Sequence, residues 1–140
     1  MSDAPGPRER ILVWLLRLGA VTLFLAFPTM LQPVSSQAAT HDLLGMGEFP
    51  VSPVVDYLTR SIAALYGFHG GLLLLVSFDV RRYRPVVVYL AFMNVVLGLM
   101  LLAIDLHAGL PFWWTAGEGP GVTAMGLALA WLVRAVPSRP

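Results

Sequence analysis

The chain has 140 residues, 57% of them hydrophobic and only 12% charged, and its formal net charge at pH 7 is +1. A soluble domain of this size needs more polar side chains to cover its surface, so we expect the chain to lie in a membrane. The absence of cysteine from the sequence excludes disulfides, thiolate nucleophiles and cysteine-ligated metal centres. Because the charges are not gathered into one basic patch, nucleic-acid binding is not expected.

Four apolar runs are long enough to cross a bilayer as helices. A helix rises about 1.5 Å per residue and the hydrocarbon core is about 30 Å thick, so about 20 mainly apolar residues are required. We therefore predict an all-α fold, a membrane-embedded four-helix bundle with up-down-up-down topology that forms one domain over residues 1–140. The predicted spans are residues 11–31, 57–78, 86–106 and 120–136.

The arginines predict which side of the membrane each connection occupies, because short cytoplasmic connections retain Arg and Lys whereas exported ones lose them. Arginines precede the first span, lie together between the second and third, and follow the fourth; they are Arg8, Arg10, Arg81, Arg82, Arg84, Arg134 and Arg139. The other two connections, residues 32–56 and 107–119, contain neither Arg nor Lys. Both are predicted to be exported, and both termini are predicted to be cytoplasmic.

The first span has a second interpretation as a secretory signal peptide. A basic start, an apolar run and then small residues are typical of such peptides, and Ser36-Gln37-Ala38 would be the cleavage site. Arg17 interrupts the run, however, and the distance from the run to the cleavage site is unusually long. We therefore favour a retained span.

Turn residues predict where several helices begin. In the first exported connection, Thr40 is expected to cap a short surface helix that Gly45 ends. Ser52 and Pro53 have the pattern of a helix start, a capping hydroxyl followed by a first-turn proline. Pro85 is predicted to start the third span in the same way.

Small residues recur at helical spacing on three of the predicted spans. Helices associate in a bilayer through small residues that let backbones approach, and through interhelical hydrogen bonds. We expect the faces that carry them to look into the bundle. The predicted packing residues are Gly67, Gly71, Gly98 and Gly126.

Two polar side chains are predicted near the middle of the bilayer, His69 in the second span and Asn94 in the third. Counted from the cytoplasmic turn, they lie at almost the same depth, which allows a hydrogen bond between them. An ionisable residue in the membrane is a candidate functional residue, because a polar group left unpaired in hydrocarbon is costly. A structural imidazole bonded to a neighbour is the simpler interpretation and the one we favour.

A second candidate site lies at the exported helix ends, where charged side chains from several helices reach a similar depth. Arg60 can pair with Asp105 or Glu118, and a partly desolvated pair of this kind is typical of an outward-facing pocket. The predicted ligand-binding residues are Arg60, Asp105, Glu118 and His107. A set of solvated interfacial charges is the simpler interpretation, since exposed ion pairs are common and contribute little.

No sequence motif predicts a catalytic residue. The phosphate-binding loop, the zinc-protease helix and the nucleophile elbow are all missing from the sequence. His41, Asp42, His107 and Glu118 are residue types that bind metals, but no pair spaced by four places them on a rigid element, so we predict no metal site. Because His69 and His107 lie at different depths, they do not form the axial ligand pair of a haem, and we expect no cofactor.

Two short segments carry a resemblance to a known family. Residues 79–85 read Asp-x-Arg-Arg-x-Arg-Pro, and residues 113–120 read Trp-Trp-Thr-x-Gly-Glu-Gly-Pro. Together with the four spans, they resemble the DoxX-like group of small bacterial membrane proteins. The resemblance implies a location in the bacterial inner membrane and an accessory role, in a group linked to quinone-associated redox or stress functions. It carries over no catalytic residue.

The sequence predicts a multi-pass membrane protein that acts as an accessory subunit or binds a lipophilic ligand. A membrane enzyme or redox helper acting on a quinone-like or lipid substrate is one alternative, and a small channel or transporter is another. An enzyme needs an enclosed pocket, an accessory subunit needs an unpacked small-residue face, and a channel needs a continuous polar path. The expected partners are the lipid bilayer and either other membrane subunits or further copies of this chain.

Overall fold

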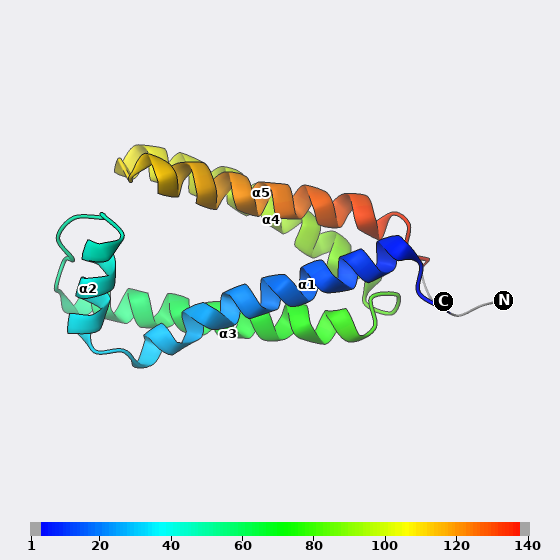
Figure 1. Cartoon of the computed structure of the whole chain (residues 1–140), viewed down its shortest axis with the longest axis horizontal. Coiled ribbons are helices and arrows are strands. Elements are labelled where there is room, and N and C mark those ends of the chain that lie inside the picture. The colour runs from blue at the N-terminus through cyan, green and yellow to red at the C-terminus, as the bar shows by residue number, and fades with distance from the viewer. Residues whose placement is uncertain (1–3, 138–140) are drawn as a thin grey trace. The chain divides into compact units, whose positions relative to one another are not determined.

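The computed structural model describes residues 4–137, and within that range the chain is helical with no strand. This confirms the predicted all-α fold. Arg139, one of the arginines used to predict the orientation, lies outside the described residues. The helical elements are α1 (Pro7–Ala26), the 3₁₀ helix η1 (Phe27–Leu31), α2 (Val34–Leu43), α3 (Pro53–Phe78), α4 (Arg84–Ala108) and α5 (Phe112–Val133) (Figure 1).

Three helical segments are long and apolar enough to cross a membrane, namely Pro7–Leu31, Pro53–Phe78 and Arg84–Ala108. They correspond to the first three predicted spans. Such runs form helices because, where water is absent, each backbone N–H and C=O must find its partner within the segment. Helix α5 is not among the three, and its first half carries Glu118, Pro120 and several glycines.

The chain divides into two compact units. Unit 1 consists of Met1–Arg17 and Leu75–Pro140, and unit 2 consists of Leu18–Leu74. Helices α1 and α3 each contribute one part to unit 1 and the other part to unit 2.

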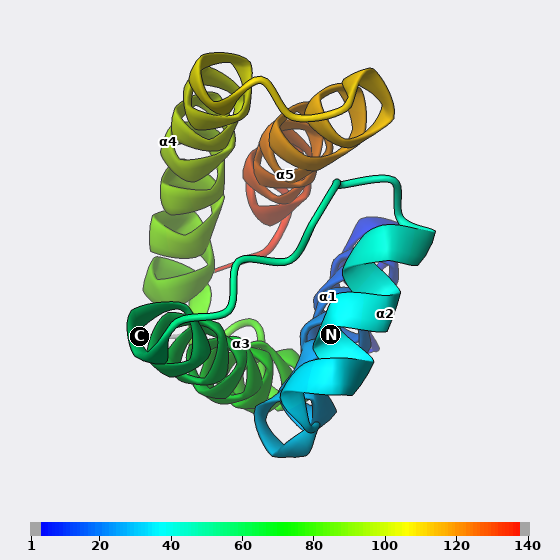
Figure 2. The same cartoon turned by 90° about the vertical axis from the view of Figure 1, so that its left-hand side faces the viewer.

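In unit 1, α4 and α5 lie side by side as an antiparallel pair (Figure 1, Figure 2). Glycines permit this close approach. A Cβ atom at Gly119 would lie 2.7 Å from the backbone nitrogen of Leu102. One at Gly126 would lie 2.7 Å from the backbone nitrogen of Val95, and Gly98 lies in the same contact, facing Gly119. Because atoms do not approach so closely, any side chain at these positions would push the two helices apart.

The connection between α4 and α5 is shorter than predicted. Gly109 ends α4 with a left-handed backbone (φ +68°), and its N–H donates to the Asp105 carbonyl. Pro111 lies immediately before α5, so most of residues 107–119, predicted as a connection, are helical. Pro120 therefore lies inside α5 rather than at its start. A glycine that ends one helix, followed closely by a proline that begins the next, is sufficient to turn the chain. Helix α5 therefore begins after Pro111, nine residues before Pro120.

In unit 2, α2 is longer than the predicted surface helix. It begins at Val34, directly after the extended residue Pro33, rather than at Thr40. The Thr40 hydroxyl instead donates to the Ser36 carbonyl one turn back, as it does inside a helix. Gly45, with a φ of +67°, lies just beyond the end of α2. Gly45 thus lies at the predicted end of the helix. The helix begins earlier than predicted because the backbone is extended only as far as Pro33.

The start of α3 follows the predicted pattern. Helix α3 begins at Pro53, and the backbone N–H of Val55 donates to the Ser52 hydroxyl at 3.2 Å. Within unit 2, a Cβ atom at Gly70 would lie 3.0 Å from the Ala20 carbonyl oxygen, so the second part of α1 packs closely on α3. Phe27 of η1 lies directly over Gly67. At Gly71, by contrast, no atom of another segment lies within 4 Å of the position of a Cβ.

The glycine contact between α4 and α5 should contribute to the stability of unit 1. Replacing Gly119 by Ala should lower the free energy of unfolding by about 1–3 kcal/mol, because the added methyl group overlaps backbone atoms of α4. Thermal unfolding in mild detergent, followed by circular dichroism, measures the change. Gly117→Ala on the same helix is the matched control, since nothing lies within 4 Å of a Cβ there. Equal loss in both variants would contradict the glycine contact.

Candidate functional site

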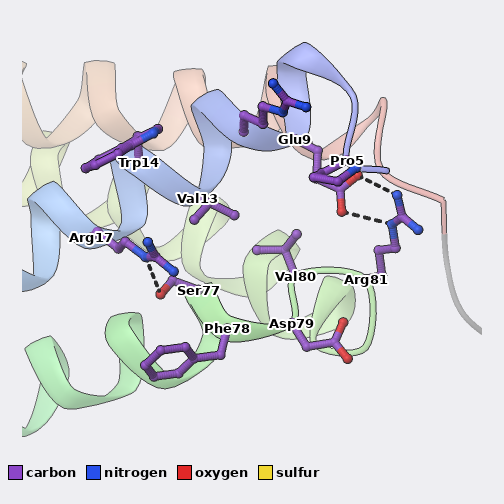
Figure 3. Close-up of a pocket in the computed structure, with 11 residues that line it drawn as sticks. Pro5, Glu9, Val13, Trp14, Arg17, Ser77, Phe78, Asp79, Val80 and Arg81 are labelled. Atoms are coloured by element: carbon purple, nitrogen blue, oxygen red, sulfur yellow. Dashed lines mark hydrogen bonds and ion pairs between the residues drawn. The ribbon is translucent and has the colours of Figure 1, made fainter. Parts of the chain in front are cut away.

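Unit 1 contains an open pocket of about 400 Å³ between the start of α1 and the turn that follows α3 (Figure 3). This volume lies in the lower part of the range for small-molecule sites, about 300–1,000 Å³. We call it the arginine pocket. Its charged and aromatic lining residues include Glu9, Arg10, Trp14, Arg17, Phe78, Asp79 and Arg81.

Helical spacing brings three of these side chains to one face of α1. Arg10, Trp14 and Arg17 are separated by four and then three residues, so they lie above one another on the helix surface. The buried side chains Leu12 and Leu16 occupy the opposite side and belong to the apolar core of unit 1. This amphipathic start gives α1 one face for the core and another for the pocket.

A two-pronged ion pair joins the start of α1 to the turn after α3. The Nε atom of Arg81 donates to Glu9 Oε1 at 2.8 Å, and Nη2 donates to Oε2 at 2.9 Å (Figure 3). The side chains of Arg81 and Glu9 are only 17% and 11% exposed. Paired guanidinium and carboxylate groups in this parallel geometry are stronger than single hydrogen bonds. The pair therefore holds one wall of the arginine pocket and neutralises both charges.

The guanidinium group of Arg17 is hydrogen-bonded through one of its three nitrogen atoms. Its Nε donates to the hydroxyl of the buried Ser77 at 3.4 Å, and its guanidinium carbon lies 5.9 Å from the centre of the Phe78 ring. Its two terminal amino groups form no hydrogen bond within residues 4–137. Figure 3 shows the Asp79 carboxylate directed away from Arg17. Asp79 instead accepts a hydrogen bond from the Arg82 backbone N–H, at 3.1 Å, within the turn.

Arg10 is the second available cation of the pocket. Its side chain is exposed, and it forms neither a hydrogen bond nor an ion pair with the described part of the chain. Arg8, two residues earlier, lies instead over the Trp131 ring of α5 at 4.7 Å. The basic residues at the start of α1 thus differ in role, since Arg8 packs against an aromatic ring and Arg10 faces the pocket.

Arg60, predicted to bind a ligand, lies in unit 2 and has three partners there. Its Nε donates to Asp56 Oδ1 at 2.9 Å, one turn earlier on α3. Its terminal nitrogens donate to the carbonyls of Met30 and Gln32, at the end of η1. The amide of Gln37 also reaches the Gln32 carbonyl, at 3.4 Å. Arg60 therefore satisfies carbonyl groups that the end of a helix leaves unpaired.

The other three predicted ligand-binding residues lie in unit 1. Asp105 is 2% exposed, and its Oδ2 atom finds no hydrogen-bond partner among residues 4–137. Glu118 accepts a hydrogen bond from the indole N–H of Trp114, at 2.6 Å, on its own helix. His107 is exposed near the end of α4. Asp105 and Glu118 thus belong to the α4 and α5 pair, and each unit carries its own part of the predicted cluster.

The two predicted midplane residues are also divided between the units. His69 is half-buried on the part of α3 in unit 2, and Asn94 is half-buried on α4 in unit 1. The Asn94 side-chain amide donates to the Leu90 carbonyl of its own helix at 2.7 Å. This bond satisfies one polar group of Asn94 without help from a neighbouring helix.

Within residues 4–137, no group of three His, Asp or Glu side chains is placed to hold a metal ion. Sequence reasoning did not single out the arginine pocket. The signal was present in the spacing of Arg10, Trp14 and Arg17, but the pocket also needs Ser77 and the pairing of Glu9 with Arg81. Those two features join segments about 60–70 residues apart, and periodicity along one helix does not report them.

A comparison of the chain with protein-family models found no match, and comparisons with curated proteins and with solved structures also found none. The resemblance to DoxX-like proteins therefore stays an expectation drawn from residues 79–85 and 113–120. A function for the chain must come from its own residues, above all those of the arginine pocket.

The Glu9 and Arg81 pair makes a prediction about stability. Arg81→Ala should lower the free energy of unfolding by about 3 kcal/mol, because it leaves the Glu9 carboxylate poorly solvated and without its partner. Chemical unfolding in detergent measures the loss. The double variant Glu9→Leu with Arg81→Met is the control, since it removes both charges and should recover much of the stability. A double variant no more stable than Arg81→Ala would contradict the burial argument.

Proposed function

We propose that the chain is a small multi-pass membrane protein that binds a lipophilic molecule, with the polar end of that molecule in the arginine pocket. In this proposal α5 is the fourth span of a membrane-embedded bundle, and both termini are cytoplasmic. The three long apolar helices support a membrane location. The positions of the arginines support the orientation, which brings the arginine pocket to the cytoplasmic surface.

The observation that carries the proposal is a mixed polar and apolar lining at the end of apolar helices. Arg17 and Ser77 provide hydrogen-bonding groups, while Trp14 and Phe78 are both 69% exposed at the same pocket. Lipophilic molecules with a polar head need this combination, because the head must be bonded where the tail leaves water. Trp also favours the boundary between lipid and water.

An accessory subunit is the second candidate function. Gly71 supports it, since no atom of another segment lies within 4 Å of the position of a Cβ there. A small residue on such an open helix face suits a partner helix. In this function the partner would be another membrane polypeptide. The two candidates differ in what remains bound when the protein leaves the membrane.

The proposed orientation predicts a labelling pattern, and the absence of cysteine from the chain makes the test simple. Ser35→Cys, in α2, should react in intact cells with a maleimide that does not cross membranes. Tyr83→Cys should react only after the cells are permeabilised, and it leaves all three arginines of the turn in place. Reaction of both positions in intact cells, or the reverse pattern, would contradict the orientation.

The proposed ligand binding predicts what copurifies with the protein. Mass spectrometry of protein extracted gently from its own membrane should find a lipophilic molecule in a fixed ratio to the chain. Arg17→Gln should retain less of it, because a hydrogen-bonding cation of the pocket is removed. Arg134→Gln changes the charge equally but outside the pocket lining, and should retain it in full. A stoichiometric polypeptide without any lipophilic molecule would favour the accessory subunit instead.

A further inference from the structure

We propose that the arginine pocket takes the phosphate group of an anionic phospholipid, held between Arg10 and Arg17. This inference rests on the proposed function and names the class of molecule that the pocket binds. The phosphate belongs to the polar head of the lipid, and the acyl chains lie outside this assignment.

The charge of the pocket favours an anion. Five charged side chains line it, three arginines and two acids. The Glu9 carboxylate is engaged by both prongs of Arg81, and the Asp79 carboxylate accepts a hydrogen bond from the turn backbone. Neither Arg10 nor Arg17 forms an ion pair with an acid of the described residues. With three arginines against two acids, the lining has one positive charge in excess.

The geometry favours a phosphate group among anions. Arg10 and Arg17 are two helical turns apart on one face of α1, about 11 Å between their Cα atoms. Both side chains line the pocket. The guanidinium group presents its N–H donors in a planar fork that matches phosphate oxygens. Because Ser77 already holds Nε of Arg17, the two terminal amino groups are oriented and remain free to donate together.

The surroundings favour a lipid over a soluble phosphate. Trp14 and Phe78 flank the arginines and are largely exposed, which suits contact with acyl chains and with the interface rather than with water. In the proposed orientation, the pocket also faces the cytoplasmic leaflet. That leaflet carries anionic lipids and attracts basic residues at helix ends.

Titration of the purified full-length protein with phosphatidylglycerol, followed by native mass spectrometry, tests the inference. Phosphatidylcholine with the same acyl chains measures binding to a zwitterionic head. Arg10→Gln and Arg17→Gln should each weaken phosphatidylglycerol binding by about tenfold and weaken phosphatidylcholine binding less, because the choline cation offsets the charge of its phosphate. Arg17→Lys, which keeps the charge but loses the planar fork, should fall between Arg17→Gln and the native protein.

Arg82→Gln is the matched control. Arg82 follows Arg81 in the turn between α3 and α4 but does not line the pocket. It should bind phosphatidylglycerol as the native protein does. Equal weakening in Arg82→Gln would show general surface attraction and overturn the inference. Displacement of the lipid by millimolar inorganic phosphate would also overturn it, since the pocket would then bind the free anion. Thermal unfolding of each variant confirms that it is folded.

The same variants separate this inference from the proposed function. If Arg17→Gln loses its copurified lipophilic molecule but binds phosphatidylglycerol as the native protein does, the phosphate assignment is wrong and the proposed function stands. If it retains that molecule in full and also binds phosphatidylglycerol unchanged, both are wrong. Weakened phosphatidylglycerol binding in the Arg10 and Arg17 variants, with Arg82→Gln unaffected, supports both.

Discussion

The ion pair between Glu9 and Arg81 is the interaction on which the candidate site depends. It joins the first turn of α1 to the turn between α3 and α4, which lie 72 residues apart in the chain. Both side chains are mostly removed from water, so the pair is stable only because each oxygen of Glu9 accepts a hydrogen bond from Arg81. The pair also engages the carboxylate next to Arg10 in the sequence, so that Glu9 is not the partner of Arg10.

A second constraint acts between the last two helices of unit 1. Helices α4 and α5 approach closely enough for contact between their backbones, the kind of contact that holds helices together in a bilayer. Gly119 and Gly126 permit that contact, and the short connection around Gly109 and Pro111 orders the two helices as neighbours. The side chains of Leu129 and Leu132 on α5 are buried within the fold. Close packing here supports the apolar core against which the pocket-bearing part of α1 rests.

The candidate site shows why a pattern along the sequence identifies some functional residues and not others. Arg60 is conspicuous in the sequence as a charge near the end of an apolar run, yet in unit 2 it bonds Asp56 and the carbonyl groups at the end of η1. Conversely, Arg10 and Arg17 resemble ordinary basic residues at a helix start. Their importance depends on which of their neighbours already have partners, and that depends on contacts between distant segments.

Local sequence patterns were sufficient to predict the helical class, the three apolar segments long enough to span a membrane, and the start of α3 at Pro53. These features follow from local rules, since apolar length, hydroxyl caps and proline act within a few residues. The pairing of Glu9 with Arg81 and the contact of Ser77 with Arg17 became visible only in the folded chain. Hydrogen-bond partners far apart in the chain are selected by how the helices pack, and neither composition nor periodicity contains that information.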